Sequence, residues 1–515
     1  MTNRSARNYF LVLLAVFTAL VLLSWPILFS FDLWVLKDRG NLLNVDYLLE
    51  QHLGLGVDAY YIYGLLPVLL QHLAFQVGGR GFWPLLAFNV PYVVLTALFW
   101  SWFVRQTPQP RGWLLAAVLL SPLLLWPNPN FPYVLVQLSL LFSLLLVYER
   151  RLDAALAVAV VGCYSVPSLP FIASAGICAV ILVEWWRAPN RTLTGLLRLI
   201  APGAIVFFLL GAVLSALYGL QSVIATLFPM TGAKFYQSNH YGLFTRGSGL
   251  DFIAPVGAGW RYYLANHAGW WIVSTLVLFG FAALALYEGA RQRIPAKAVE
   301  FIVLCGVLHA VFAFYAYSVP PQHVIYDPVL VAGTLAGLAW LPLGSLRNLL
   351  MIPLVGLGTL GSWAQVHETY TAWRETRIFP ESAGLYAARA WIPEWTQVVR
   401  LSRERSVLLL SYGTGAHNYF PTIQSPQSWT LQWGQMRPAD MERLVARIAA
   451  VDVVVEDMSG PTLLIEGTPQ ITQALEAFCL TSETANFKTY WKRTPSRSSP
   501  PCVPPSASRR DPGIS

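Results

Sequence analysis

The sequence predicts a polytopic α-helical membrane protein with a C-terminal extramembrane α/β domain, and three observations lead to this fold class. Of the 515 residues, 56% are hydrophobic and 12% are charged, whereas an average soluble protein is about 45–50% apolar and about 25% charged. The chain contains 20 Trp and 23 Tyr, which are residues that concentrate at membrane interfaces. The apolar residues also gather in long runs. Together these features argue against an ordinary soluble enzyme.

The apolar runs are the candidate membrane spans. About eleven of them approach the roughly 20 residues that a helix needs to cross a bilayer, although several are short. They cover residues 10–31, 83–104, 113–127, 131–148, 153–165, 168–186, 199–220, 268–288, 298–318, 327–344 and 348–365. The first run is too long for a signal peptide, and no A-x-A cleavage site follows it.

The basic residues indicate the orientation of these spans. The net charge is +8, but Lys and Arg are scattered between apolar runs and therefore do not indicate a nucleic-acid partner. With the N-terminus in the cytoplasm, the inner loops are basic, and the short outer loops 127–132, 166–170 and 319–326 contain no Lys or Arg, as the positive-inside rule requires. We therefore expect a bacterial inner-membrane protein with its C-terminal domain in the periplasm; a lumenal domain in the endoplasmic reticulum is topologically equivalent.

Residues 60–78 are apolar enough to span, but a span there would place every later basic loop outside. We interpret this stretch as a helix that lies at the outer interface and packs against the bundle. The transmembrane domain 1–365 then has two long outer loops, residues 32–82 and 221–267. We see no internal repeat, which argues against the commonest secondary-transporter designs.

Residues 366–493 have the composition of a soluble domain, large enough for its own core. Strands are predicted at 406–411, 452–456 and 487–492, with helices at 438–450 and around 470–479, an order typical of a small α/β layer. The segment 412–420, YGTGAHNYF, contains G-x-G after a strand but lacks the third glycine of a dinucleotide site, so a strand-to-loop turn explains it better. Residues 494–515, rich in Pro, Ser and Arg, are predicted to be disordered.

Cysteines and the membrane histidine give weaker signals. The five cysteines show no C-x-x-C spacing, and three lie in apolar runs, so they indicate neither a metal cluster nor a disulfide framework. His309 lies within a predicted span, where we expect a hydrogen-bonded core residue more than a proton relay.

The strongest local signal for chemistry is the density of acids in the first outer loop. Asp32, Asp38, Asp46, Glu50 and Asp58 occur there, with His52 among them. One interpretation is a solvated loop whose acids cap short helices. The other is a general base at the mouth of a membrane cavity, where partial burial raises the proton affinity of a carboxylate.

Residues 44–70 resemble the first outer loop of GT-C class glycosyltransferases, membrane enzymes that take sugars from polyprenyl-phosphate donors. In that class an acid after the first span is followed by an Asp, an aromatic cluster and a Gly-Pro or Gly-x-x-Pro turn. The matching residues are Asp46, Asp58, Tyr60, Tyr61, Tyr63, Gly64 and Pro67. The resemblance extends to the layout of spans, long outer loop and outward C-terminal domain.

The resemblance implies inverting transfer to a glycan, lipid or protein acceptor, with a loop carboxylate as the base. Asp46 is the first choice, and Asp58 and Asp32 remain alternatives. The paired Asp-Glu or D-x-D of the class is missing, so no cofactor is expected and a divalent metal, although possible, is not indicated. Fixed cations would bind the donor phosphate. The first candidates, in the second long outer loop, are Lys234, His240, Arg246 and Arg261. Arg80 and His323 are weaker candidates, and Tyr236 is expected to line the substrate cavity.

Two other functions fit the same sequence. A ligase or polymerase of lipid-linked glycans would depend on Arg246 and Arg261 more than on Asp46. A lipid or glycan transporter would need a polar path through the bundle. The predicted spans offer few polar residues for such a path, among them Asn89, Gln137 and His309.

Overall fold

The chain forms two compact units in the computed structural model. The helical unit comprises Met1–Trp25, Ile62–Gly79 and Trp83–Ala372, and the C-terminal unit comprises Pro26–Tyr61, Arg80–Phe82 and Trp373–Ser515. The structure describes residues 3–31, 35–36, 38–61, 63–79, 82–108, 111–119, 131–189, 191–228, 267–316, 328–382, 384–411, 413–428, 431, 436–458, 468–493 and 502. Most of the expected first outer loop therefore belongs to the unit that contains the C-terminal domain.

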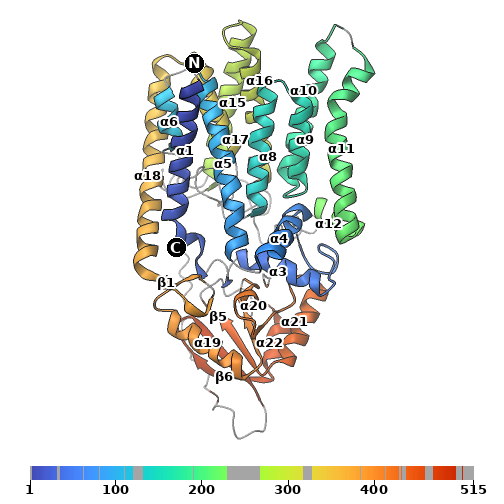
Figure 1. Ribbon diagram of the computed structural model, residues 1–515, viewed down its shortest axis with the longest axis vertical. Helices are drawn as coiled ribbons and strands as arrows, with labels where there is room; N and C mark the ends of the chain where they lie inside the picture. The colour runs from blue at the N-terminus through green and yellow to red at the C-terminus, as the bar shows by residue number, and fades with distance from the viewer. Residues whose placement is uncertain are drawn as a thin grey trace. The chain divides into compact units, whose positions relative to one another are not determined.

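The helical unit consists of helices that follow the apolar runs of the sequence (Figure 1). They are α1 (Asn3–Leu23), α4 (Leu65–Gly78), α5 (Phe82–Gln106), α6 (Arg111–Leu119), α8 (Phe131–Tyr148), α9 (Leu152–Cys163), α10 (Ser168–Arg187), α11 (Leu193–Tyr218), α12 (Leu220–Leu227), α15 (His267–Ala290), α16 (Ala296–Ala316), α17 (Pro328–Trp340) and α18 (Ser345–Glu375). Local sequence sets their ends. Helix α11, for example, begins after Thr192, whose hydroxyl accepts from the Gly195 amide at 3.1 Å, and it ends at Gly219 with φ +85°.

Two helices of the described residues are long and apolar enough to cross a membrane, Leu169–Arg187 and Leu193–Tyr218. Six further apolar helices, α1, α4, α8, α9, α15 and α17, have shorter stretches of 10–17 residues among the residues searched. Helix α9 has 12 residues and is about 18 Å long at the usual rise per residue, which is less than the roughly 30 Å of hydrocarbon. The structure thus establishes a mostly helical chain with two such helices.

An ion-pair cluster joins three helix ends at one end of the helical unit. Arg150, which follows α8, contacts Glu184 near the end of α10 at 3.1 Å and Glu300 near the start of α16 at 2.5 Å. The Nζ atom of Lys297 lies 4.3 Å from the centre of the Tyr148 ring. These are the ends that the charge pattern of the sequence assigns to one side of the membrane.

The opposite end of α8 contacts the start of α4. The Gly64 amide donates to the Ser165 carbonyl at 2.6 Å, and the Ser165 hydroxyl donates to the Pro132 carbonyl at 2.6 Å. Helix α4 has 14 residues, so it is too short to cross ~30 Å of hydrocarbon. Its start packs on the turn that follows α9, which is bonded to the first turn of α8.

We expect Gly64→Ala to lower the free energy of unfolding by about 1–3 kcal/mol, because overpacking forces backbone shifts. A Cβ at Gly64 would lie 2.1 Å from the Tyr164 carbonyl oxygen, a backbone atom that cannot move aside cheaply. Thermal unfolding of the purified full-length chain measures the effect. Gly280→Ala is the matched control, since nothing lies within 4 Å of its added Cβ. Equal midpoints for the two variants would contradict this packing.

The C-terminal unit contains a five-stranded mixed sheet with strand order β4-β3-β5-β7-β6. Its elements are β1 (Thr376–Ile378), β2 (Tyr386–Ala388), α19 (Ile392–Glu404), β3 (Val407–Leu410), α20 (Ala416–Tyr419), β4 (Ile423–Gln424), α21 (Pro438–Ala450), β5 (Val453–Asp457), α22 (Pro469–Leu475), β6 (Phe478–Glu483) and β7 (Phe487–Lys492). Strand β3 is parallel to both β4 and β5, whereas β7 is antiparallel to β5 and β6. The sequence prediction of strands near β3, β5 and β7 and of helix α21 is confirmed.

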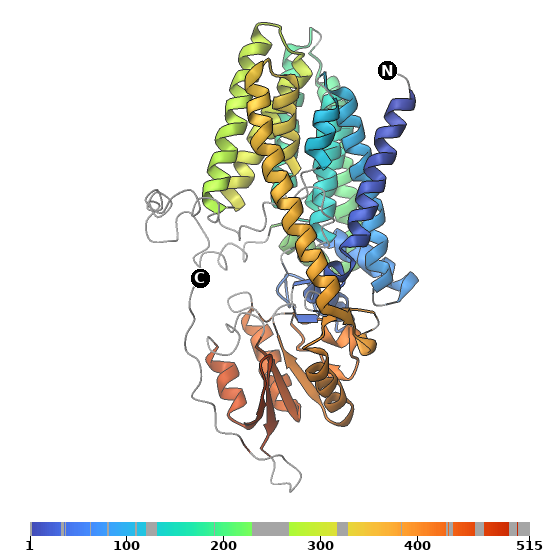
Figure 2. The ribbon, with the colours of Figure 1, turned by 90° about the vertical axis from the view of Figure 1, so that its left-hand side faces the viewer.

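Helices cover both faces of this sheet (Figure 2). On one face Leu408 and Val454 pack with Leu444 and Ile448 of α21 and with Ile471 of α22. On the other face Trp395 of α19 lies edge-on to Phe487, with ring centres 5.0 Å apart. Both central strands are fully buried, as expected for parallel strands between two helical layers.

Residues 26–61 supply part of the core of the C-terminal unit. The fully buried Phe31 ring lies 4.4 Å from Trp395, 5.7 Å from Phe379 and 5.8 Å from Phe420, between ring centres. The Tyr386 amide also donates to the Phe29 carbonyl at 2.9 Å. The C-terminal unit therefore has an N-terminal contribution that its own sequence, read alone, does not reveal.

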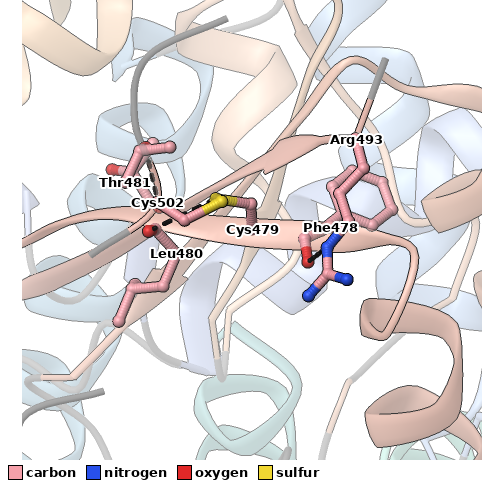
Figure 3. The surroundings of a disulfide bond; sticks show 7 residues. Phe478, Cys479, Leu480, Thr481, Arg493 and Cys502 are labelled. Carbon is pink, nitrogen blue, oxygen red and sulfur yellow. Dashed lines mark hydrogen bonds between the residues drawn. A yellow bond between two sulfur atoms is a disulfide. The ribbon is translucent and has the colours of Figure 1, made fainter. Parts of the chain in front are cut away.

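A disulfide joins Cys479 of β6 to Cys502, with Cα atoms 5.5 Å apart (Figure 3). This corrects the expectation of no disulfide, because pairing depends on distance in space and the two residues have no diagnostic spacing. Cys163, Cys178 and Cys305 form no disulfide. Of residues 494–515, which are predicted to be disordered, the structure describes only Cys502, so that prediction lies outside the described residues.

Candidate functional site

Asp46 lies on a helix that the sequence builds from a leucine-rich, proline-free stretch. Helix α3 (Asp38–Glu50) ends where His52 adopts φ +57°, with the Leu53 amide donating to the Leu48 carbonyl at 3.1 Å and the His52 amide to Leu49 at 2.9 Å. This is the Schellman arrangement, with histidine in the place that glycine usually takes. The Asp46 side chain is 5% exposed. The principal candidate base thus lies within a packed helix of the C-terminal unit.

Two buried asparagines attach α3 to the loops that follow strands β3 and β4. The Asn41 side-chain oxygen accepts from the Thr414 amide at 3.0 Å and from the Thr414 hydroxyl at 3.1 Å. Asn44 accepts from the Ser425 hydroxyl at 3.4 Å and donates to the Ser428 carbonyl. A buried side-chain amide without a hydrogen-bond partner destabilises the folded state. These bonds therefore fix the position of the helix that carries Asp46.

The place where α3 docks is the one where open α/β sheets usually bind ligands. Such ligands lie outside the carboxyl ends of parallel strands, where successive connections leave in opposite directions. Strand β3 connects to β4 on one side, and β5 lies on its other side. Thr414 follows β3, and the Gly413 amide donates to the Leu36 carbonyl at 2.6 Å. The G-x-G segment therefore binds Leu36 and Asn41 of the same chain, in agreement with its interpretation as a strand-to-loop turn.

The turn after α3 is bound by two arginines, Arg437 at the N-cap of helix α21 and Arg443 within that helix. Arg437 donates to the carbonyls of Gly56 and Val57, and Arg443 donates to that of Asp58 at 2.9 Å. Asp58 itself is exposed, and its carboxylate accepts from the Gly54 amide at 2.8 Å. This bond closes the turn of residues 54–58, which lies between α3 and α4, and does not cap a helix.

Asp440 organises this contact and was not identified from the sequence. It is fully buried and accepts from Arg443 at 2.5 Å, from the Arg437 amide at 3.0 Å and from the Tyr60 amide at 3.3 Å. Burial raises the pKa of the Asp440 carboxyl above its usual value, and the bond from the Arg437 amide and the charge of Arg443 oppose that rise only in part. The only local signal was the i, i+3 spacing of Asp440 and Arg443 on a predicted helix.

His417 is a second residue that sequence reasoning missed. It lies on α20, and its ring centre is 4.5 Å from that of Tyr47, the residue after Asp46. Imidazole is the side chain that most often serves as a general acid or base. Its presence in the YGTGAHNYF segment was the only signal, and it brings a proton-transfer group into the same unit as Asp46.

The other predicted site residues are distributed as follows. Tyr60 and Tyr61 are buried in the C-terminal unit, whereas Tyr63 belongs to the helical unit, where its ring lies 5.7 Å from that of Tyr133. His309 is buried and contacts the Ser274 hydroxyl at 2.8 Å, as a core histidine does. The remaining candidates lie outside the described residues, namely Asp32, Arg80, Lys234, Tyr236, His240, Arg246, Arg261 and His323.

Among the described residues, no three His, Cys, Asp or Glu side chains gather into a group that could hold a metal ion. The described part of the candidate site therefore comprises the buried Asp46 carboxylate on α3, the Tyr47–His417 ring contact and the arginine-bound turn. A carboxylate and an imidazole can each accept a proton. Comparison with protein-family models gives no match, and comparison with curated protein sequences gives none either.

Proposed function

We propose that this chain is a GT-C type glycosyltransferase of a bacterial inner membrane, which transfers a sugar from a polyprenyl-phosphate donor to an acceptor on the outer face. The observation that carries the proposal is the fixation of α3. Asn41, Asn44 and the contacts of Asp440 hold the acid-bearing loop against the C-terminal unit. A base needs such a rigid support, because small displacements from the acceptor hydroxyl slow proton transfer.

Membrane insertion is supported by the outward faces of the helices. Soluble monomers rarely expose large contiguous apolar patches, yet several long helices of the helical unit carry rows of exposed apolar side chains. They include Leu193, Leu197, Ile205, Phe208, Leu209, Val213 and Leu217 on α11, Leu276, Val277 and Leu286 on α15, and Leu346, Leu349 and Ile352 on α18. Hydrocarbon tails are the solvent that suits such faces.

The ion-pair cluster supports the proposed topology of about eleven spans. Arg150, Glu184 and Glu300 bring together three helix ends that the basic-loop pattern places in the cytoplasm. The contacts of Gly64 and Ser165 lie at the opposite end of α8, on the proposed outer side. Helix α4 then lies at the outer interface, and the C-terminal unit is periplasmic.

The proposed reaction is an inverting displacement. Asp46 takes the proton of the acceptor hydroxyl while the acceptor oxygen bonds to the anomeric carbon and the bond from that carbon to the lipid phosphate breaks. The departing phosphate gains charge, and cations stabilise it more in the transition state than in the ground state. Lys234, His240, Arg246 and Arg261 are the proposed partners of that phosphate, and Tyr60, Tyr61, Tyr63 and Tyr236 the proposed lining of the cavity.

Donor turnover tests this function. We expect the full-length protein, reconstituted in lipid nanodiscs with a panel of polyprenyl-phosphate sugars, to release polyprenyl phosphate from at least one donor. A ligase of lipid-linked glycans would instead consume polyprenyl-diphosphate glycans, and a transporter would move its lipid without cleaving it. The absence of release from every monophosphate donor, by protein shown to be folded, would refute the proposal.

A further inference from the structure

The cysteines divide according to the two units. Both cysteines of the C-terminal unit, Cys479 and Cys502, are disulfide-bonded, whereas Cys163, Cys178 and Cys305 of the helical unit form no disulfide. Cys479 is 6% exposed and lies on β6, the strand at one edge of the sheet. Its sulfur bonds to that of Cys502, 23 residues later in the chain (Figure 3). The pair is thus a covalent link from the edge strand to the C-terminal tail.

We infer that Cys479 and Cys502 are a modification site for a thiol–disulfide oxidoreductase and that the C-terminal unit folds in an oxidising compartment. Disulfides persist in secreted and periplasmic proteins and are rare in the cytosol. The distribution of Lys and Arg in the loops of the helical unit independently predicts that the C-terminal unit lies outside the cytoplasm. The charge pattern and the disulfide therefore both indicate that the C-terminal unit lies on the outer side of the membrane.

The oxidation is a pair of thiol–disulfide exchanges. The thiolate of one cysteine attacks the disulfide of the oxidoreductase, forming a mixed disulfide and expelling one enzyme thiolate. The second cysteine of the chain, as a thiolate, then attacks the mixed disulfide. Two protons and two electrons leave the Cys479–Cys502 pair, and the oxidoreductase departs as a dithiol. No other oxidant enters the step.

The link also has a structural consequence. Among the described strands, β6 pairs with β7 alone, and exposed edge strands invite pairing with other chains. Arg493 anchors the chain after β7 by donating from Nε to the Phe478 carbonyl at 3.0 Å. The disulfide adds a second anchor and keeps Cys502 at this edge.

Thiol trapping in cells tests the inference. The test uses cells that express a variant with Cys163, Cys178 and Cys305 replaced by Ser. After acid quenching and treatment with a polyethylene-glycol maleimide, the unreduced protein should show no gel shift. After reduction, it should show a two-step shift. Cys502→Ser is the matched control, and it should give a one-step shift without reductant. A two-step shift of the unreduced sample would overturn the inference.

Sidedness is tested on spheroplasts of the same cells. A membrane-impermeant reductant should make the pair modifiable in intact spheroplasts, and reduction only after permeabilisation would refute the outer placement. If the triple replacement prevents accumulation, peptide mapping of the alkylated wild-type chain decides whether Cys479 and Cys502 are linked. The inference rests on the proposed membrane placement, but its readout is the thiol state, so loss of glycosyl transfer would not affect it.

Discussion

We expect Asp46→Asn to slow the release of polyprenyl phosphate by about 10²- to 10⁴-fold, the usual contribution of a general base. The amide has nearly the same shape as the carboxylate but cannot take the acceptor proton. Because Asp46 lies within α3, which Asn41 and Asn44 fix, the variant should keep the fold around the helix. Single-turnover release in nanodiscs is the measurement.

The control for Asp46→Asn is Glu50→Gln, which removes a carboxylate from an exposed position one turn later on the same helix. It should retain wild-type release. Full activity of Asp46→Asn would exclude Asp46 as the base and move the assignment to Asp58 or Asp32. If Arg246→Ala and Arg261→Ala abolish activity while Asp46→Asn does not, the lipid-linked glycan ligase becomes the better assignment.

Asp440→Ala should destabilise the C-terminal unit by about 2–4 kcal/mol, because it leaves a charge and two amides without their acceptor. The affected donors are the Arg443 guanidinium and the amides of Arg437 and Tyr60. Hydrogen exchange of peptides from β5 and α21 in the full-length protein measures the loss. Asp440→Asn, which retains an acceptor oxygen, should lose less. Equal protection from hydrogen exchange in Asp440→Ala and wild type would contradict a stabilising role for the bonds that Asp440 accepts.

The pH dependence of the same unit has a defined sign. Burial raises the pKa of the folded Asp440 carboxyl above its unfolded value, so the folded state binds more protons between these two pKa values. Its contribution to the free energy of unfolding therefore falls as pH rises through that interval and is constant above it. The stability difference between wild type and Asp440→Asn should decrease from the acid side of the interval to neutral pH. A difference that increases with pH would refute this assignment.

Local pattern predicted the regular elements of the C-terminal unit. The β-branched and leucine runs of β3 and β5 and the helical spacing of α21 are visible within a few residues. Other elements have no such signal. Strand β4 has two residues and exists through its pairing with β3, and β6 begins at Phe478, where the sequence suggested the end of a helix. Helix α19, although amphipathic, was missed because its apolar residues are few.

The candidate site was predictable only in part. The density of acids drew attention to residues 32–58, and that signal is compositional. The role of each acid depends on contacts between segments far apart in the chain: Asn41 and Thr414 are separated by 373 residues, and Tyr60 and Asp440 by 380. No local pattern relates such residues, and hence Asp440 and His417 escaped notice.

The sequence by itself determined the apolar, helix-rich character of the chain and the α/β character of its C-terminal residues. These properties follow from composition and from periodicities of two and 3.6 residues, which act over one element at a time. Only the tertiary structure decided that residues 26–61 belong to the C-terminal unit, that α3 docks at the carboxyl ends of β3 and β4, and that Cys479 pairs with Cys502. Those contacts arise because distant segments bury polar and aromatic groups together, and their energies depend on three-dimensional packing.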